Sequence, residues 1–218
     1  MVLSNLRRTM QVGGLTEGSG NRILGSAVSS EKCRVTFHGR NATLIIGDRC
    51  SLDNSNFKLY DGAVIAIGEN SRYTGSILAH IGCLVTLGAN LQANGFLNIS
   101  SAEETKVTLG KDCLISSATI RSSDMHPIYD LETNERVNMG ADVTIGDHVW
   151  FGQESIVLKG VTIGSGCVLA LRSMVTRDVE PNCVVGGSPA KILRRNIRWH
   201  SNLPLRRGLT DHPSMIRP

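Results

Sequence analysis

The chain is poor in aromatic residues, and it contains no long apolar run. Phe, Trp and Tyr account for 4% of its 218 residues, although 41% are hydrophobic and 23 are glycine. A core of this composition must consist of small and branched aliphatic side chains, which suits a narrow and repetitive interior. Because no stretch reaches about 18 apolar residues, and the N-terminus lacks the apolar segment and cleavage pattern of a secretory signal, we expect a cytoplasmic protein with no transmembrane segment.

The cysteines lack the spacing of a disulfide framework or of a metal site. The six of them are Cys33, Cys50, Cys83, Cys113, Cys167 and Cys183. None forms a C-x-x-C pair, and their intervals do not match those of zinc ligands. The sequence therefore predicts no bound metal, and the cysteines are better explained as small packed side chains in the core.

Positive charge gathers at the end of the chain and accounts for most of the formal net charge of +4. The cations concerned are Lys191, Arg194, Arg195, Arg198, Arg206, Arg207 and Arg217. Such a cluster favours an anionic partner. No aromatic stacking platform or recognition helix accompanies it, so we expect a phosphorylated small molecule and no nucleic acid. For residues 206–218, a solvated basic tail is the alternative.

A six-residue repeat runs through the C-terminal half of the chain. From Met139 to Glu180 the sequence divides into seven hexads: MGADVT, IGDHVW, FGQESI, VLKGVT, IGSGCV, LALRSM and VTRDVE. The first position is always aliphatic or Phe, the fifth is small or medium, and the second is often Gly or Ala. A period of six fits neither a helix nor simple strand alternation. It predicts a solenoid in which each hexad adds a short strand and a corner, with the first position pointing into a shared core.

Degenerate copies of the hexad occur further upstream. They begin at Ile46, Ile67, Leu87 and Leu109, which are 21, 20 and 22 residues apart. Three hexads need only 18 residues, so each upstream coil is expected to carry a few extra residues at a corner. Three of the cysteines, at 50, 113 and 167, occupy the fifth hexad position, and we expect them to be buried.

The repeat is interrupted on a large scale once, between Ile120 and Met139. This segment is polar, contains Pro127 and shows no hexad. We therefore expect an excursion loop over residues 121–138, and loops that leave a rigid scaffold often carry function. We expect three segments: an N-terminal cap (1–40), a solenoid (41–195) and a C-terminal basic arm (196–218). The arm is expected to form a short helix or to pack back on the coils.

The hexads, together with VVGGSPAKILR at residues 184–194, resemble the hexapeptide-repeat acyltransferases. The order from SSDMHPIYD through DHVWFGQESIVLKGVTIGSG to VVGGSPAK is most similar to the capsule and lipopolysaccharide O-acetyltransferases, including those that modify sialic-acid polymers. The resemblance covers about residues 40–195 and implies an all-β, left-handed parallel β-helix shaped as a triangular prism. Handedness rests on the resemblance alone, because the general rule for parallel crossovers favours right-handed connections.

The resemblance also implies an activity and an assembly. These enzymes transfer acetyl from acetyl-CoA to a carbohydrate hydroxyl, and we expect this chain to do so directly, as a homotrimer with active sites between subunits. The reaction needs a base for the hydroxyl proton, donors for the oxyanion, and a site that holds CoA beside the acceptor. Flat solenoid faces with exposed apolar groups are commonly buried by cyclic symmetry, which also favours a trimer.

His126 is the candidate general base. It is the only histidine in the expected loop, and it matches the loop histidine that acts as base in the resembling enzymes. A structural hydrogen-bonding role is the alternative. His148 is expected to face solvent at a corner, and His38, His80, His200 and His212 have no comparable context. Either of two nearby carboxylates, Asp124 and Asp130, would orient the base or else cap turns of the loop.

Trp150 is the second candidate catalytic residue. Its ring is too large for the narrow core, so we expect it on the outer face of its hexad. The resemblance implies that a tryptophan here helps to form the active site, and nearby backbone N–H groups would then serve the oxyanion. Simple packing at a subunit interface is the alternative.

For CoA, the resemblance implies residues in the C-terminal coils, where small side chains leave room for the pantetheine arm and cations meet the phosphates. The matching positions are Gly152, Ala170, Ser173, Lys191 and Arg194. Two features depart from the pattern. Leu171 and Arg172 stand where relatives often have smaller residues, and Arg177 would compete with Arg194 for a phosphate.

Three other functions remain open from the sequence. A hexapeptide-repeat carbonic anhydrase would need three histidines that converge on zinc, and the histidine spacing opposes it. A non-catalytic solenoid scaffold would not need the loop histidine. Acetylation of an amine or of another small acceptor would use nearly the same residues.

Overall fold

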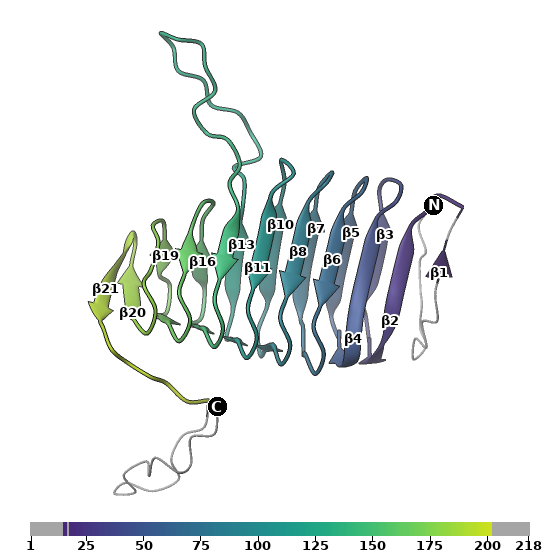
Figure 1. The fold of residues 1–218 in the computed structure, drawn as a ribbon, viewed down its shortest axis with the longest axis horizontal. Coiled ribbons are helices and arrows are strands. Elements are labelled where there is room, and N and C mark those ends of the chain that lie inside the picture. Colours follow the sequence, from purple (N-terminus) through teal and green to yellow (C-terminus); the bar gives the residue numbers. More distant parts are fainter. Residues whose placement is uncertain (1–14, 17, 202–218) are drawn as a thin grey trace, which may run out of the picture.

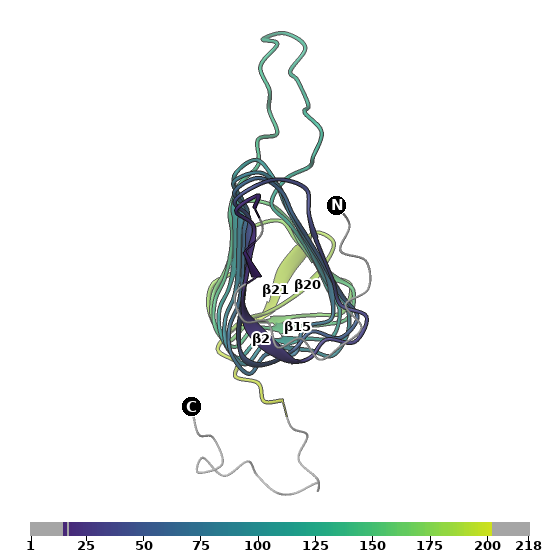
Figure 2. The same cartoon turned by 90° about the vertical axis from the view of Figure 1, so that its right-hand side faces the viewer.

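The chain folds into an elongated prism with three walls. The computed structural model describes residues 15, 16 and 18–201, and this part of the chain contains strands but no helix. Figure 1 shows the strands stacked side by side along the prism, and Figure 2 shows its triangular cross-section. None of the described segments forms a helix long and apolar enough to cross a membrane.

Each wall of the prism is one sheet. In spatial order, the eight-stranded sheet consists of β1 (Leu15–Thr16), β2 (Arg22–Ser29), β4 (Thr43–Ser51), β6 (Val64–Ile67), β8 (Leu84–Leu87), β11 (Lys106–Leu109), β14 (Val143–Ile145) and β17 (Thr162–Ile163). The seven-stranded sheet consists of β19 (Met174–Val175), β16 (Ser155–Val157), β13 (Ala118–Arg121), β10 (Leu97–Ser101), β7 (Gly75–Ala79), β5 (Ser55–Leu59) and β3 (Arg34–Phe37). The six-stranded sheet consists of β21 (Ala190–Arg194), β20 (Val184–Gly187), β18 (Val168–Leu169), β15 (Trp150–Phe151), β12 (Leu114–Ile115) and β9 (Gln92–Ala93). Pairing is parallel except for β1 with β2 and β20 with β21.

Coil length differs between the two halves of the prism, as the sequence predicts. Thr144 pairs with Thr162, a step of 18 residues or three hexads. Upstream, Thr43 pairs with Val64, a step of 21 residues. The strands of the upstream coils stay parallel in spite of the extra residues, although the pairing of β2 with β4 contains register shifts.

The hexad positions predict the core with one exception. The first positions of the last six hexads are buried: Ile145, Phe151, Val157, Ile163, Leu169 and Val175. All seven fifth positions are buried as well: Val143, Val149, Ser155, Val161, Cys167, Ser173 and Val179. Cys50 and Cys113 are likewise buried. Met139 is the exception, because it is 60% exposed and still belongs to the excursion loop, and the regular coil resumes only at Val143.

The corners explain the Gly, Asn and Asp residues of the repeat. At the corner between the eight-stranded and six-stranded sheets, one residue per coil has a left-handed backbone: Arg49, Asn70, Asn90, Asp112, His148, Gly166 and Asn182. Gly, Asn and Asp adopt this conformation at the lowest cost, and histidine is also enriched there, whereas arginine is uncommon. His148 is therefore placed at a sharp turn directly before β15.

Parallel strand pairing extends into the residues that the sequence analysis assigns to an N-terminal cap. β2 and β3 lie within the expected cap (1–40), yet they pair in parallel with β4 and β5 of the next coil. At the other end, residues 195–201 are irregular and contain no helix. The rest of the expected arm, including Arg206, Arg207, His212 and Arg217, lies outside the described residues, so the division into three segments stays a prediction.

Candidate active site

The excursion loop leaves the prism between β13 and β14 and runs over residues 122–142. Figures 1 and 2 show it projecting from the edge where the seven-stranded and eight-stranded sheets meet, which we call the loop edge. The loop is a narrow ribbon, because the Val137 amide donates to the carbonyl of Ile128 at 2.9 Å and Tyr129 pairs with Arg136 in an antiparallel bridge. Five large apolar side chains of the loop are exposed: Ile128, Tyr129, Leu131, Val137 and Met139.

An ion pair anchors one side of the loop to the prism. The Arg136 guanidinium contacts the Glu103 carboxylate at 2.8 Å, and Glu103 comes from the preceding coil. The same carboxylate accepts hydrogen bonds from the Ser123 hydroxyl and from the Gly140 amide. Hydrogen bonds from Arg136 first, and then from Ser123, lower the pKa of Glu103 from 4.5 to about 2. The carboxylate is therefore ionised at neutral pH and holds both ends of the loop.

Asn138 forms the second anchor, at the base of the loop. Its side chain is almost fully buried, and its Nδ2 donates to the His126 carbonyl at 2.8 Å and to the Asp124 carboxylate at 2.9 Å. Its Oδ1 accepts from the Ile128 amide at 2.7 Å. Lys159, from the following coil, pairs with Asp124 and donates to the Asn138 carbonyl at 3.0 Å. Asn138 thus fixes the backbone on both sides of Pro127, directly after the histidine.

Asp124 is held by this anchor and not by the histidine ring. A hydrogen bond from Lys159 first, and a second from Asn138, lower its pKa. The other flanking carboxylate, Asp130, accepts the backbone amides of Glu132 and Thr133 at 2.9 Å each. Asp130 therefore caps a turn, one of the two roles that the sequence leaves open, and neither carboxylate hydrogen bonds to the His126 ring.

His126 has a fixed backbone and an exposed ring. The residue is exposed, and its imidazole makes no hydrogen bond with any residue in the described part of the chain. A ring presented in this way can accept a proton from a hydroxyl that arrives from outside the chain. The structure thus places the candidate base without an internal partner for its side chain.

Trp150 lies on the outer face of β15, as expected, and is 37% exposed. Its indole Nε1 lies 3.4 Å from the Ser116 hydroxyl. The backbone N–H groups of Trp150 and Gly152 do not serve an oxyanion, because they donate to the carbonyls of Cys167 and Leu169 at 2.9 and 2.8 Å. Figure 2 shows β15 in the wall opposite the loop edge. Within one chain, the two candidate catalytic residues therefore face different directions.

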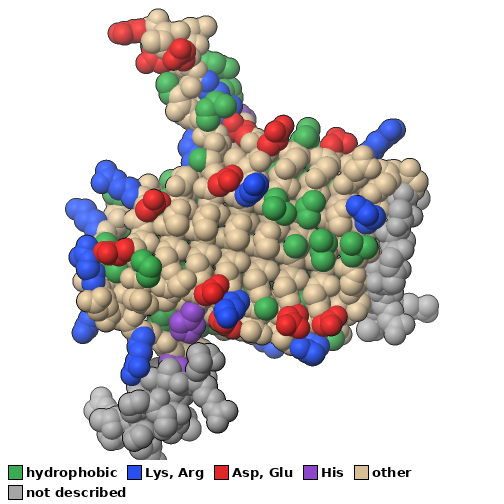
Figure 3. All heavy atoms as spheres, viewed as in Figure 1, with side chains coloured by type: hydrophobic (Ala, Val, Ile, Leu, Met, Phe, Trp, Pro, Cys, Tyr) green, Lys and Arg blue, Asp and Glu red, His purple; other side chains and the backbone are tan. Residues whose placement is uncertain are grey.

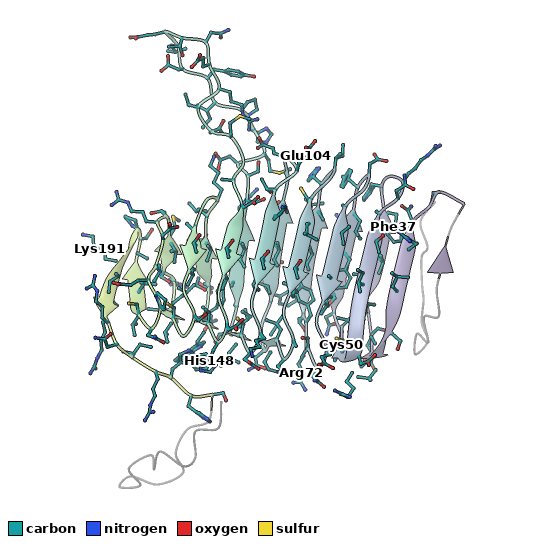
Figure 4. The ribbon with its side chains drawn as sticks, in the orientation of Figure 1. Phe37, Cys50, Arg72, Glu104, His148 and Lys191 are labelled. Carbon is teal, nitrogen blue, oxygen red and sulfur yellow. The ribbon has the colours of Figure 1, made fainter. Side chains whose placement is uncertain are left out.

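Trp199 lies beside Trp150, although sequence reasoning missed it. Its ring stacks on the His148 imidazole with centroids 4.0 Å apart and planes 4° from parallel, and its Nε1 donates to the His148 carbonyl at 3.0 Å. The centroid of Trp150 is 5.8 Å away. The sequence predicts that His148 faces solvent, but it is half-buried, because the Trp199 ring covers one face of its imidazole. Figure 4 labels His148 at the side of the prism along which the C-terminal segment runs.

Four of the five candidate CoA residues gather at one corner, between the six-stranded and seven-stranded sheets. A Cβ on Gly152 would lie 2.9 Å from the carbonyl carbon of Ala170 in the next coil, so only glycine fits there. The Ser173 hydroxyl donates to the Ala170 carbonyl at 2.7 Å. Lys191 pairs across the β20–β21 hairpin with Gly186, where an added Cβ would meet the Ala170 side chain at 3.1 Å. Small residues of three successive coils therefore meet at one corner, which we call the small-residue corner. Ala170 is half-buried there, whereas Gly152 and Ser173 are buried.

Lys191 borders this corner, whereas Arg194 lies at the other end of β21, opposite Val184. Lys191 and Arg194 are exposed, and neither forms an ion pair among the residues that the structure describes. Figure 3 shows several Lys and Arg side chains at the end of the prism that carries β21, with others spread over the rest of this face. Arg172, a departure from the expected pattern, is paired with Glu154 at 2.6 Å, whereas the neighbouring Leu171 is exposed. Within residues 18–201, no group of three or more His, Cys, Asp or Glu side chains is arranged to hold a metal ion.

Comparisons with known proteins find acetyltransferases, and polysialic acid O-acetyltransferases are among them. No protein-family model matches the chain. It is 38% identical over 189 residues to the polysialic acid O-acetyltransferase of Neisseria meningitidis, an alignment that covers 84% of the chain and 87% of the relative. It is also 38% identical over 136 residues to the polysialic acid O-acetyltransferase of Escherichia coli O1:K1, but it spans only 44% of that longer protein.

The solved structures give the same answer for the fold. The crystal structure of the polysialic-acid-specific acetyltransferase NeuO matches with a TM-score of 0.83 and 33% identity, over 91% of this chain and 84% of that one. The predicted left-handed parallel β-helix is therefore confirmed.

Proposed function

The chain belongs to the hexapeptide-repeat O-acetyltransferases, and we propose that it transfers the acetyl group of acetyl-CoA to a hydroxyl of a sialic-acid polymer. The observation that supports this most strongly is His126. Its backbone is clamped by Asn138 at the base of a projecting loop, while its imidazole has no partner in the described part of the chain. This geometry suits a general base for an external hydroxyl, and the acceptor is inferred from the substrates that the similar enzymes' names state.

Direct transfer follows from the groups available. The acceptor oxygen attacks the thioester carbonyl carbon while the neutral His126 imidazole takes the hydroxyl proton. The tetrahedral intermediate then collapses, the carbon–sulfur bond breaks, and the imidazolium returns its proton to the departing thiolate. The cysteines at 50, 83, 113, 167 and 183 are buried, and burial raises the pKa of the Cys113 thiol to about 11. None of these thiols suits an acetyl-enzyme intermediate.

The small-residue corner is the proposed site for CoA. Its lack of side chains would let the extended pantetheine arm lie against backbone along Gly152, Ala170 and Ser173. The exposed cations of Lys191 and Arg194 would then meet the phosphates at the end of the prism. The residues present thus fit a long, anionic and flexible substrate.

A homotrimer with shared sites is part of the proposal. His126 extends from the loop edge, whereas Trp150 lies in the opposite wall, so a site that uses both needs two chains. The loop also exposes apolar side chains, and Leu131 is fully exposed, which favours burial against a neighbouring prism. The predicted cytoplasmic location stays a prediction.

The test of the function is thiol release from acetyl-CoA against a panel of acceptors. The panel contains a sialic-acid polymer, free sialic acid, a lipopolysaccharide, a galactoside and an amino sugar, with His126→Ala as the matched inactive control. We expect release with the sialic-acid polymer and little with the others. Release only with the amino sugar would replace O-acetylation by N-acetylation, and no release with any acceptor would favour a non-catalytic scaffold.

The test of the shared site mixes two inactive variants. In trimers assembled at random from equal amounts of His126→Ala and Trp150→Ala chains, about one interface in four has both partners intact. Activity should return to roughly a quarter of the wild-type value. Verified mixed trimers that stay inactive would show that one chain supplies both residues, and a Trp150→Ala trimer that is active by itself would show that Trp150 is not required.

A further inference from the structure

Both tryptophans of the chain meet at one place on its surface. The sequence contains only two, Trp150 and Trp199. They belong to the six-stranded sheet and to the C-terminal segment, and their ring centroids are 5.8 Å apart with planes tilted by 43°. In a protein with so few aromatic residues, the convergence of both indoles on one exposed surface needs a reason. Large rings that are not required for the core are typical of a binding surface.

The C-terminal segment is held firmly where it carries Trp199. The indole covers one face of the His148 ring, its Nε1 donates to the His148 carbonyl, and the His148 Nε2 lies 3.2 Å from the Trp199 carbonyl. Two residues earlier, the Ile197 amide donates to the Asn182 carbonyl at 3.0 Å. Trp199 is only half-buried in spite of these contacts. A fixed and partly exposed indole therefore stands beside Trp150.

The tryptophan pair lies apart from the small-residue corner, so it can bind a substrate other than CoA. The chain enters β15 through the corner that contains His148 and leaves it through the corner that contains Gly152. Trp150 lies on the strand between them, so Trp199 extends its surface away from the proposed CoA site. A molecule bound to Trp199 would approach Trp150 from the edge opposite to CoA.

We infer that Trp199 and Trp150 together bind the acceptor sugar chain, with Trp199 contacting a sugar residue next to the one that is acetylated. This inference rests on the proposed function. An indole offers a broad apolar face to the C–H groups of a sugar ring and a hydrogen-bond donor at its edge. An acidic glycan is the class of acceptor that this surface fits.

The charges around the pair agree with an acidic acceptor. Arg198 is exposed and has no ion-pair or hydrogen-bond partner within residues 18–201, so its guanidinium is free to bind a sugar carboxylate. Arg195 is already paired with Glu180 at 2.6 Å. The nearby carboxylates of Asp112 and Asp147 accept hydrogen bonds from Asn90 and from the Lys111 amide, which lessens their repulsion of an anionic ligand.

The two tryptophans make a direct binding test possible, because replacing one leaves the other as the only indole. Trp150→Phe leaves Trp199 as the reporter, and Trp199→Phe leaves Trp150. Each variant is titrated with sialic-acid oligomers of increasing length, with a neutral oligosaccharide, and with CoA. We expect the Trp199 emission in Trp150→Phe to change saturably with the longer sialic-acid oligomers. It should not respond to the neutral oligosaccharide and should respond little to CoA.

Steady-state kinetics provide the second readout. Trp199→Ala should raise the KM for a sialic-acid polymer about tenfold and leave the KM for acetyl-CoA within about twofold. Tyr60→Ala, which removes a half-buried ring stacked between His38 and His80 on the loop edge, is the matched control and should leave both constants unchanged. Circular dichroism and molecular mass verify that each variant is folded and assembled.

Two results would overturn the inference. The first concerns a polymer that the wild-type enzyme acetylates. If this polymer does not change the Trp199 emission of Trp150→Phe, and if Trp199→Ala has the wild-type KM for it, the inference fails. The other is a rise in the KM for acetyl-CoA alone, which would assign Trp199 to the cofactor side. Either result leaves the proposed function intact, whereas a wild-type enzyme that does not acetylate the polymer would reject the proposed function itself.

Discussion

Replacement of Asn138 by alanine tests how the loop presents its histidine. The change removes the two hydrogen bonds that Nδ2 donates to the His126 carbonyl and to Asp124, and it also removes the acceptor of the Ile128 amide. Bonds between neutral groups contribute about 0.5–1.5 kcal/mol each, and a bond to a carboxylate contributes about 1.5–3 kcal/mol. Their sum is about 2.5–6 kcal/mol, but part of it is recovered when the freed groups bind water.

We expect about half of this sum to appear as a loss of the productive loop conformation. Because about 1.4 kcal/mol corresponds to a factor of ten, kcat should fall by roughly ten- to a hundredfold. The KM for acetyl-CoA should change little, since Asn138 lies at the loop edge, which is a different corner of the prism from the small-residue corner. Local opening of a surface loop leaves the rest of the prism folded, so the thermal unfolding midpoint should move only slightly.

The assay is steady-state kinetics on four proteins: wild type, Asn138→Ala, His126→Ala and the double variant. If Asn138 acts through the histidine, its replacement should have almost no further effect once the imidazole is gone. A wild-type kcat for Asn138→Ala would refute this reasoning. A full additional loss of activity in the double variant would show that Asn138 acts on the reaction independently of His126.

Three further outcomes follow from the same geometry. His126→Ala should lower turnover by at least about a hundredfold, as expected for a lost general base, while acetyl-CoA affinity measured by calorimetry stays nearly constant. Lys191→Ala should raise the KM for acetyl-CoA more than that for dephospho-CoA derivatives, and an equal rise for both would point to a structural lysine. Glu103→Gln should loosen the loop at pH 7, because the pKa of Glu103 is lowered to about 2 in the folded protein from 4.5. The stabilisation is present above about pH 4.5 and is lost as the pH falls towards 2. Proteolysis of the loop should therefore distinguish Glu103→Gln from wild type at neutral pH and not near pH 2, and a difference that persists in acid would contradict the assignment.

The sequence predicts the prism because the position of a residue in its hexad indicates whether its side chain points into the core. Ile145, Phe151 and Val157 are buried since each begins a hexad, and the same spacing identifies the family. Met139 occupies the first position of a hexad, but its side chain is exposed and not in the core. Its hexad begins inside the excursion loop, and a periodic pattern does not reveal where an irregular segment rejoins a coil.

The contacts of the candidate site are harder to predict because they join segments without a period. Asn138 is one of several polar residues in the loop, and only the folded ribbon brings its amide to the His126 carbonyl. Trp199 contacts His148, 51 residues earlier, through a segment that carries no hexad. A tryptophan among cations near the C-terminus is the signal that was available for Trp199, and no spacing linked it to Trp150. The roles of Trp150, Gly152, Ala170, Ser173, Lys191 and Arg194 stay predictions that follow from the resemblance.

The most direct test of the account is to follow the acetyl group itself. A sialic-acid polymer is incubated with acetyl-CoA labelled with carbon-13 at the acetyl carbonyl, and the polymer and the protein are examined separately by NMR and mass spectrometry. We predict an alkali-labile ester on the polymer, no label on the protein, and no ester when His126→Ala replaces the wild type. An alkali-stable amide, an acetylated protein, or an unlabelled polymer would contradict the account.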